Sequence, residues 1–385
     1  MIYLDYNATG PTDPRVIEVM KPYFAELYAN PSSIHTPGQR AKQAVEHSRV
    51  VLAQFLNARP EEVYFTSGGT EADNLAIKGL AFAQDKRKKI IYSSIEHHAV
   101  MNTCKYMAKF GYEIISVPVD KYGVVDINFI EDKTDEDTLI VSVMHANNEV
   151  GTIQPIREIA QIAHKYGAVF HTDAVQTVGK INIDIMALEI DMLSLSGHKF
   201  YGPKGVGALI VKKGIKFDPL LHGGHHEKNH RAGTENVPGI VGLSKACELA
   251  RAEILAEEEK RLKELRDRLW QGLNSRIPEI QLNGHPEKRL SNTLNFSVKY
   301  VEGESLILNL NAAGICASTG SACSSGSLEP SHVLLAMAIP ADIAHGSLRF
   351  SLGRWTKPEE IEKVIQVLPG IVEKLRQMSP LYKKR

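Results

Sequence analysis

The sequence has no excess of charge of either sign, few cysteines and no long apolar run. Lysine plus arginine and aspartate plus glutamate each number 45 in 385 residues. This balance gives no reason to expect nucleic acid or an anionic membrane surface as the main partner. No stretch approaches the roughly 18 apolar residues of a spanning helix, and the first residues lack the basic and apolar segments of a signal peptide. We therefore expect a cytoplasmic protein that binds neither membrane nor nucleic acid directly.

The cysteines are too few and too scattered for a disulfide framework in a chain of this length: Cys104, Cys247, Cys316 and Cys323. Reduced thiols are expected, and the first three fit the usual small, buried, apolar cysteine. Cys323 differs because every neighbour from Ala317 to Ser327 is small. Such a segment favours an exposed loop, where a thiol is a hazard unless it reacts.

Strand and helix patterns alternate through the first two thirds of the chain, which predicts an α/β fold. Strands separated by helices form a mostly parallel sheet with helices on both faces, and ligands bind at the carboxyl ends of the strands. A long charged helix over 243–277 then leads to a smaller α+β unit, whose last helix should break near Pro369. We expect one domain over 12–255 and a second over 1–11 and 256–385.

The stretch from Ser194 to Gly207 centres on Lys199, a lysine on a turn between two apolar strands. A lone lysine there is normally a solvated surface residue. Here Ser196 and His198 flank it as hydrogen-bond donors, and four glycines let the backbone approach a bulky ligand. A Schiff-base lysine needs this setting, because the phosphate of the cofactor must be anchored while its aldehyde meets the amine.

Two further strand ends carry polar residues that suit such a cofactor. Gly69 and Thr70 lie in a glycine turn at a helix N-terminus, a natural phosphate site, although many helices begin this way. Asp173 ends another strand, where aspartate is often a helix cap. Beside a Schiff-base lysine, its carboxylate would instead keep a pyridine nitrogen protonated, and Gln176 could donate to the phenolic oxygen of the ring.

Three candidates are weaker when taken alone. His97 follows a strand, and its imidazole could stack on the ring and relay protons, although a lone histidine is more often structural. Asn148 is a candidate for the ring oxygen, and Arg349 for a substrate carboxylate, because a guanidinium binds two oxygens at once. The segment 226–230 matches H-E-x-x-H, but glycines and an asparagine predict a loop rather than a zinc-binding helix. No metal is expected.

Taken together, these stretches resemble the pyridoxal-phosphate cysteine desulfurases of the NifS/IscS type, which are class-V aminotransferase-like proteins. The similarity covers nearly the whole chain and rests on segments 3–9, 66–71, 96–100, 147–149, 173–176, 196–199, 231–234 and 320–323. It implies the fold-type I, aspartate-aminotransferase-like architecture, with a mostly parallel sheet flanked by helices and a smaller α+β domain. It also implies pyridoxal 5′-phosphate as cofactor.

The resemblance assigns a role to each candidate. It implies that Lys199 binds the cofactor covalently, Asp173 pairs with the pyridine nitrogen, and His97 stacks on the ring. The remaining implied contacts are Gln176 and Asn148 to the ring and its oxygen, Gly69, Thr70, Ser196 and His198 to the phosphate, Thr234 to the phosphate of the other subunit of a homodimer, and Asn148 and Arg349 to the substrate.

The implied reaction converts L-cysteine to L-alanine and leaves the sulfur on Cys323 as a persulfide. The sulfur would then pass to an acceptor, such as an iron–sulfur scaffold or a tRNA-thiolation enzyme. Two departures leave the acceptor open: Lys228 stands where the family commonly has arginine, and the sequence ends without the longer tail of some relatives. Alternatives are a selenocysteine lyase or short-loop desulfurase, against which the segment 320–323 argues, and a catalytically inactive scaffold.

Overall fold

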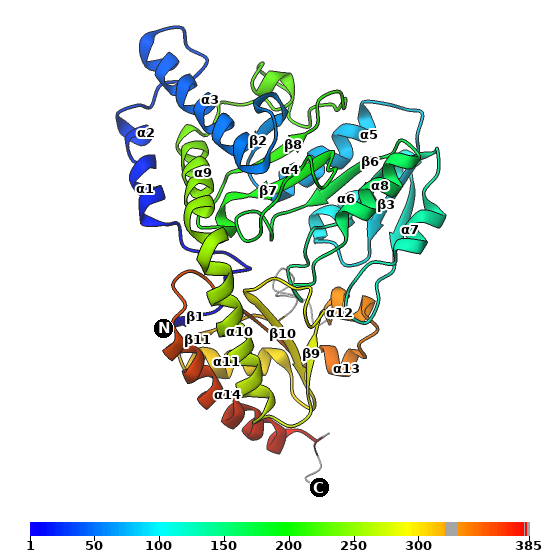
Figure 1. Ribbon diagram of the computed structural model, residues 1–385, viewed down its shortest axis with the longest axis vertical. Helices are drawn as coiled ribbons and strands as arrows, with labels where there is room; N and C mark the ends of the chain where they lie inside the picture. Colours follow the sequence, from blue (N-terminus) through cyan, green and yellow to red (C-terminus); the bar gives the residue numbers. More distant parts are fainter. Residues whose placement is uncertain (320–329, 381, 383–385) are drawn as a thin grey trace.

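The computed structural model describes residues 1–319, 330–380 and 382, without the side chains of 254–256. Its larger sheet has seven strands (Figure 1). Their order is β2 (Val63–Thr66), β8 (Gly207–Val211), β7 (Met192–Ser196), β6 (Val169–Asp173), β5 (Thr138–Ser142), β3 (Lys89–Ser93) and β4 (Glu113–Val117). Only β8 runs against its neighbours. The mostly parallel α/β sheet expected from the sequence is confirmed.

Helices cover both faces of this sheet because its strands are apolar on both sides. Ile210 of β8 packs in the cluster that includes residues of α3 and α9, whereas Leu209 packs against α4. One face carries α3 (Thr36–Leu56), α8 (Ile156–Lys165) and α9 (Val237–Leu249). The other carries α4 (Gly69–Asn74), the π-helix η2 (Leu75–Gly79), α5 (Leu80–Phe82) and α6 (His98–Met107).

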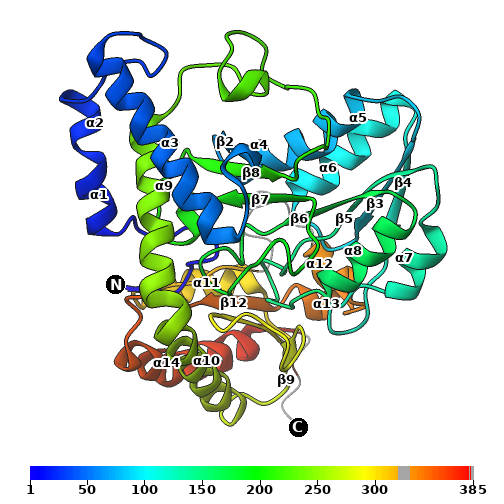
Figure 2. The ribbon, with the colours of Figure 1, turned by 45° about the horizontal axis from the view of Figure 1, so that its top comes forward.

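The shorter helices complete this part of the molecule. Figure 2 shows α1 and α2 beside α3 and α9 at one end, and α7 beside α8 at the other. Their bounds are α1 (Pro14–Met20), α2 (Pro22–Ala25) and α7 (Ile127–Lys133). Single 3₁₀ turns are η1 (Pro60–Glu62), η3 (Ala108–Phe110), η4 (Gly197–Lys199) and η5 (Glu227–Asn229).

A second core surrounds an antiparallel sheet of three strands, β12 (Ser347–Ser351), β10 (Thr293–Val298) and β9 (Ile280–Asn283). Near it, β1 (Ile2–Tyr3) pairs in parallel with β11 (Ile315–Cys316), so the N-terminal residues lie with the C-terminal part of the chain. The helices here are α10 (Glu259–Asn274), α11 (Gly303–Ala312), α12 (His332–Ala336), α13 (Ala341–Ala344) and α14 (Pro358–Met378).

One long helical segment connects the two cores (Figure 1). It begins as α9, continues through the π-helix η6 (Ala250–Glu258) and ends as α10. Because separate cores lie on either side of η6, we propose the division anticipated above, with 12–255 as one domain and 1–11 with 256–385 as the other. No helix within the described part of the chain is long and apolar enough to cross a membrane.

The expected break near Pro369 is wrong, because α14 continues through this proline to Met378. A proline inside a helix removes the hydrogen bond to the carbonyl four residues earlier. Here that carbonyl belongs to Ile365, and it accepts a hydrogen bond from Nη1 of Arg276 at 3.3 Å. A side chain from the turn that follows α10 therefore replaces the donor that the proline lacks.

Gly207 lies at the start of β8, where β7 and the glycine turn at Gly68 pack closely against it. A Cβ atom here would lie 2.4 Å from the carbonyl oxygen of Leu195 and 2.8 Å from Cα of Gly68. We expect Gly207→Ala to lower the free energy of unfolding by about 1–3 kcal/mol, as overpacking does. Gly370 of α14 has open space around it, so Gly370→Ala should raise this free energy by about 0.5–1 kcal/mol. Chemical denaturation of both variants checks the pair, and equal effects would contradict it.

Candidate active site

An open pocket of about 650 Å³ lies at the carboxyl ends of β2 and β7, and the glycine turn forms one wall. Gly69 packs so closely that a Cβ there would lie 2.6 Å from Cγ2 of Val175, and Gly68 adopts a φ of +155°. The other lining residues are rich in hydrogen-bond donors: Thr9, Ser67, Thr70, Glu71, Ser196, His198, Lys204 and Gly205. Four predicted phosphate ligands, Gly69, Thr70, Ser196 and His198, therefore meet in one pocket.

The charge of this pocket suits an anion. Its carboxylate, Glu71, is already paired with Arg231 at 3.0 Å and accepts a hydrogen bond from the backbone N–H of Ser67 at 2.8 Å. Arg231 holds the pKa of Glu71 below its usual value against the effect of burial. Lys204 adds a positive charge at the rim. An incoming phosphate would thus meet neutral donors, a lysine and a neutralised carboxylate.

Lys199 is held by the N-terminal segment. Its Nζ donates to the backbone carbonyl oxygens of Asn7 at 2.7 Å and Ala8 at 2.8 Å. The same Asn7 carbonyl accepts a hydrogen bond from Nε2 of Gln176 at 3.0 Å. Two predicted ring-binding residues, Lys199 and Gln176, therefore share one backbone acceptor.

Asp173 is buried at the end of β6 and accepts a hydrogen bond from the backbone N–H of Val175 at 2.8 Å. Burial raises its pKa to about 6, and the Val175 bond and the charge of Lys199 oppose this rise. Asp73 of α4 is also buried, and burial together with Asp173 raises its pKa well above the usual value. At neutral pH Asp173 is therefore mostly ionised, whereas burial favours the protonated form of its neighbour Asp73.

His97 is the N-cap of α6, and its Nδ1 accepts a hydrogen bond from the backbone N–H of Ala99 at 3.1 Å. The neutral ring therefore carries its proton on Nε2. Burial lowers the pKa of His97 to about 4, and the charge of Lys199 lowers it further. The imidazole is uncharged at neutral pH and electrostatically coupled to Lys199, a state that suits both stacking and proton transfer.

Arg349 lies almost fully buried in β12, with 2% of its surface exposed. Its Nη1 donates to the backbone oxygen of Asn148 at 3.0 Å, and its Nη2 pairs with Oδ1 of Asp5 at 2.9 Å. Its Nε has no hydrogen-bond partner among the described residues. The structure thus joins the two predicted substrate ligands, Asn148 and Arg349, and leaves a guanidinium donor for a carboxylate.

Cys323 lies outside the described residues, but both ends of its segment are placed. Ser318 and Arg349 exchange backbone hydrogen bonds of 3.2 and 2.7 Å, so the segment begins beside the predicted substrate arginine. At its other end, Ser331 donates to Oε2 of Glu149 at 2.5 Å. Of the other cysteines, Cys104 and Cys247 are buried as expected, whereas Cys316 is only partly buried because β1 and β11 form a sheet of just two strands.

Thr234 is exposed and does not line the pocket at the glycine turn, so its contact with a second subunit stays a prediction. The nearby H-E-x-x-H segment has a structural role in this chain. Glu227 is buried, forms two 2.8 Å hydrogen bonds with Arg49 and accepts another from the backbone of Phe65. Within the residues described, no group of histidine, cysteine or acidic side chains has the arrangement of a metal site.

Sequence reasoning missed three residues that complete the site. Asn7 binds Lys199 and Gln176, Thr9 lies 3.0 Å from Nδ1 of His198, and Nζ of Lys180 donates to Oε1 of Gln176 at 2.9 Å. The polar turn at residues 7–11 was the available signal for the first two. Lys180 had none, because it follows Gln176 by one helical turn in an unremarkable polar segment.

The sequence matches the family described as Aminotransferase class-V over residues 2–364, and the chain belongs to this family. It is 56% identical over 384 residues to a protein named "Cysteine desulfurase IscS" from Methanosarcina thermophila, covering 100% of this chain and 95% of that one. A solved NifS-like protein superposes with a TM-score of 0.91 at 40% identity, over 97% of this chain and all of the other. The solved structure "SspA in complex with cysteine" gives a TM-score of 0.82 at 36% identity, over 91% and 99% of the two chains.

These matches confirm the resemblance to NifS/IscS proteins and the fold class. Class-V aminotransferases depend on pyridoxal 5′-phosphate, which is therefore the cofactor of this chain. The residues fit it: the glycine-lined pocket offers donors for a phosphate, and the buried carboxylate of Asp173 has no cationic hydrogen-bond partner among the described residues. A pyridinium nitrogen would supply that missing positive charge.

Glu149, which lies next to Asn148 and holds Ser331, gives a prediction about pH. Burial raises its pKa from 4.5 to about 7, so the folded protein keeps a proton that the unfolded chain loses in this interval. The contribution of this group to the free energy of unfolding should therefore fall by about 3 kcal/mol as pH rises from 4.5 to 7. Glu149→Gln should flatten this dependence in denaturant titrations across that range. Glu61→Gln, at an exposed position, is the control. If Glu149→Gln leaves the pH dependence of the free energy of unfolding unchanged, Glu149 is already ionised in the folded protein across this range and the prediction is wrong.

Proposed function

We propose that this chain is a cysteine desulfurase, which converts L-cysteine to L-alanine and transfers the sulfur to Cys323. The observation that carries the proposal is the proximity of Lys199 to Asp173 and His97 at the carboxyl end of the sheet, near a donor-lined pocket, with Ser318 at the start of the Cys323 segment paired to Arg349. The curated relative named a desulfurase and the solved cysteine complex support the reaction and the substrate.

We propose the following roles. Gly69, Thr70, Ser196 and His198 hold the phosphate, Lys199 binds the cofactor covalently, and Asp173 and Gln176 contact its ring, as do His97 and Asn148. When bound, pyridoxal phosphate supplies an electron sink for the substrate carbon that loses its proton. Asp173 keeps a negative charge against the ring nitrogen, and Arg349 orients the substrate carboxylate.

The sulfur-transfer step needs no additional oxidant or reductant. The Cys323 thiolate attacks the substrate sulfur, the carbon–sulfur bond breaks, and a sulfur–sulfur bond forms on Cys323. The former substrate carbon keeps the electron pair and takes up a proton, which gives alanine. The persulfide sulfur is passed to an acceptor thiol, for which we propose an iron–sulfur scaffold or a tRNA-thiolation protein. We also propose a cytoplasmic homodimer in which Thr234 reaches the phosphate of the other subunit.

Cys323→Ser tests the sulfur-transfer step. Serine is similar in size and fits a small, polar segment, but its hydroxyl is a much poorer nucleophile toward sulfur than a thiolate. The variant should show cysteine-induced absorbance changes of the bound cofactor and no alanine or sulfide above background. Wild type treated with cysteine alone should gain one sulfur atom on the Cys323 peptide in mass spectra, and a thiol should remove it. Sulfur found on Cys316 instead, or alanine released by the variant at the wild-type rate, would refute the assignment.

Asp173→Ala tests the proposed counter-charge. The variant loses the group that favours a protonated ring, and each pKa unit of lost preference corresponds to about 1.4 kcal/mol. Turnover of cysteine should fall by several orders of magnitude, whereas cofactor bound through the phosphate pocket should still be detected in the purified protein. Near-normal alanine production by Asp173→Ala would contradict this role.

A further inference from the structure

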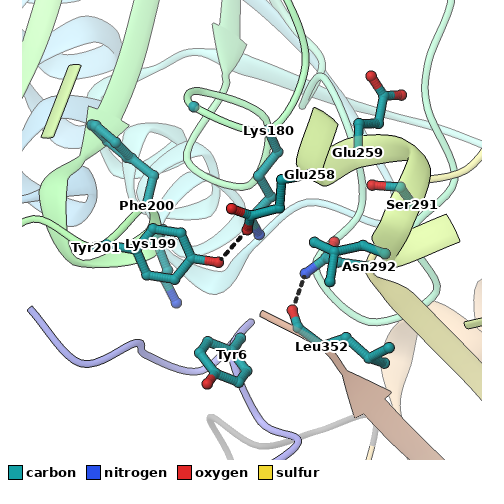
Figure 3. A pocket seen from close by; sticks show the side chains of 12 residues that line it. Tyr6, Lys180, Lys199, Phe200, Tyr201, Glu258, Glu259, Ser291, Asn292 and Leu352 are labelled. Atoms are coloured by element: carbon teal, nitrogen blue, oxygen red, sulfur yellow. Dashed lines mark hydrogen bonds between the residues drawn. The ribbon is translucent and has the colours of Figure 1, made fainter. Parts of the chain in front are cut away.

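Lys180 and Lys199 line one small cavity between the two cores. Tyr6, Tyr201 and Asn292 also line it (Figure 3). Both amines bind the same residue: Nζ of Lys199 donates to the backbone oxygen of Asn7 at 2.7 Å, and Nζ of Lys180 donates to its Oδ1 at 3.3 Å. Two cationic side chains are thereby held as neighbours.

Among the described residues, the hydrogen-bond acceptors of Lys180 are both neutral amides, Oδ1 of Asn7 and Oε1 of Gln176. Of the two carboxylates that line the cavity, Glu258 accepts from the Tyr201 hydroxyl at 2.9 Å and from Nε of Arg354 at 3.2 Å. Glu259 is exposed, and its carboxylate points away from the amines (Figure 3). Neither forms an ion pair with Lys180.

The groups around Lys180 change its pKa in opposite directions. Burial lowers the pKa of Lys180 to about 7, Lys199 and Arg349 lower it further, and Glu258 opposes them. Repulsion between two amines is mutual, so each disfavours the proton on the other. A proton on Lys180 therefore disfavours a proton on Lys199, whose amine binds the same Asn7.

This matters because an ordinary lysine is protonated at neutral pH and has no electron pair with which to attack a carbonyl. We propose that Lys180 is a positioning residue whose positive charge, held beside Lys199 by Asn7 and Gln176, favours the uncharged and nucleophilic form of the Lys199 amine. The inference rests on the proposed role of Lys199 as the cofactor-binding lysine.

The test measures the Lys199 amine directly. Wild type and Lys180→Met are stripped of cofactor and treated with acetic anhydride over a pH range, and the rate of modification of Lys199 is read from its peptide by mass spectrometry. Without the neighbouring charge, the midpoint of the Lys199 titration should rise by about one pH unit, so modification at neutral pH falls several-fold. In protein loaded with pyridoxal phosphate, the absorbance titration should shift in the same direction.

Matched variants separate charge from shape. Lys180→Arg keeps the charge and should keep the low midpoint, whereas the exposed Lys213→Met removes a distant charge and should have no effect. Lys180→Gln removes the charge but retains a polar group, and it decides the matter if Lys180→Met does not fold. An unchanged Lys199 midpoint in the neutral variants, or an equal rise in Lys180→Arg, would overturn the proposal. Because modification requires no turnover, this result is independent of whether the protein desulfurates cysteine.

Discussion

The hydrogen bonds of Asn7 hold the site together, because they join residues from both cores. Its backbone oxygen accepts from Lys199 and Gln176, and its side chain accepts from Lys180 and Asn292. Its side-chain Nδ2 also donates to the backbone oxygen of Asn148, in the part of the chain with the larger sheet, and to Oγ1 of Thr293 in β10 of the smaller sheet. A buried asparagine with donors and acceptors satisfied in this way fixes its neighbours, since any displacement would leave polar groups unpaired in a dry environment. The position of the lysine therefore depends on a segment that precedes it by almost two hundred residues.

Much of the large sheet and of the phosphate pocket could be predicted, because their signals are local. Apolar runs predict buried strands, and the glycines and hydroxyl groups after β2 and β7 indicate hydrogen-bond donors for an anion such as phosphate. The rest depends on contacts between distant segments. No local pattern reveals that Arg276 supplies the hydrogen bond that Pro369 lacks, or that Lys180 lies beside Lys199. Asp73 is a similar case, since this helical aspartate is buried, and its pKa raised, only once β7 and β8 pack against α4.

Burial and electrostatics cooperate across the site to give each titratable group a different charge state. Asp173 remains ionised at neutral pH because a backbone N–H and Lys199 offset much of the cost of its burial. His97 lacks such compensation and is uncharged, and burial with the nearby Asp173 raises the pKa of Asp73 despite a hydrogen bond with Ser194. Groups whose surroundings push their pKa values apart can serve as acid, base and counter-charge within one pocket. The fold thus sets these roles before any ligand binds.

The backbone pairing between Ser318 and Arg349 limits how far the transferred sulfur can travel. Cys323 is the fifth residue after Ser318, and an extended chain covers at most about 3.5 Å per residue, so chain length alone limits the Cys323 backbone to within about 18 Å of this anchor. The tether from Ser331 is longer and sets no tighter bound. An acceptor that takes the sulfur directly must therefore bring its own thiol inside this sphere, close to the domain junction. Under the proposed mechanism, delivery therefore depends on docking distance, and β12, which pairs with Ser318 through Arg349, determines where an acceptor must dock.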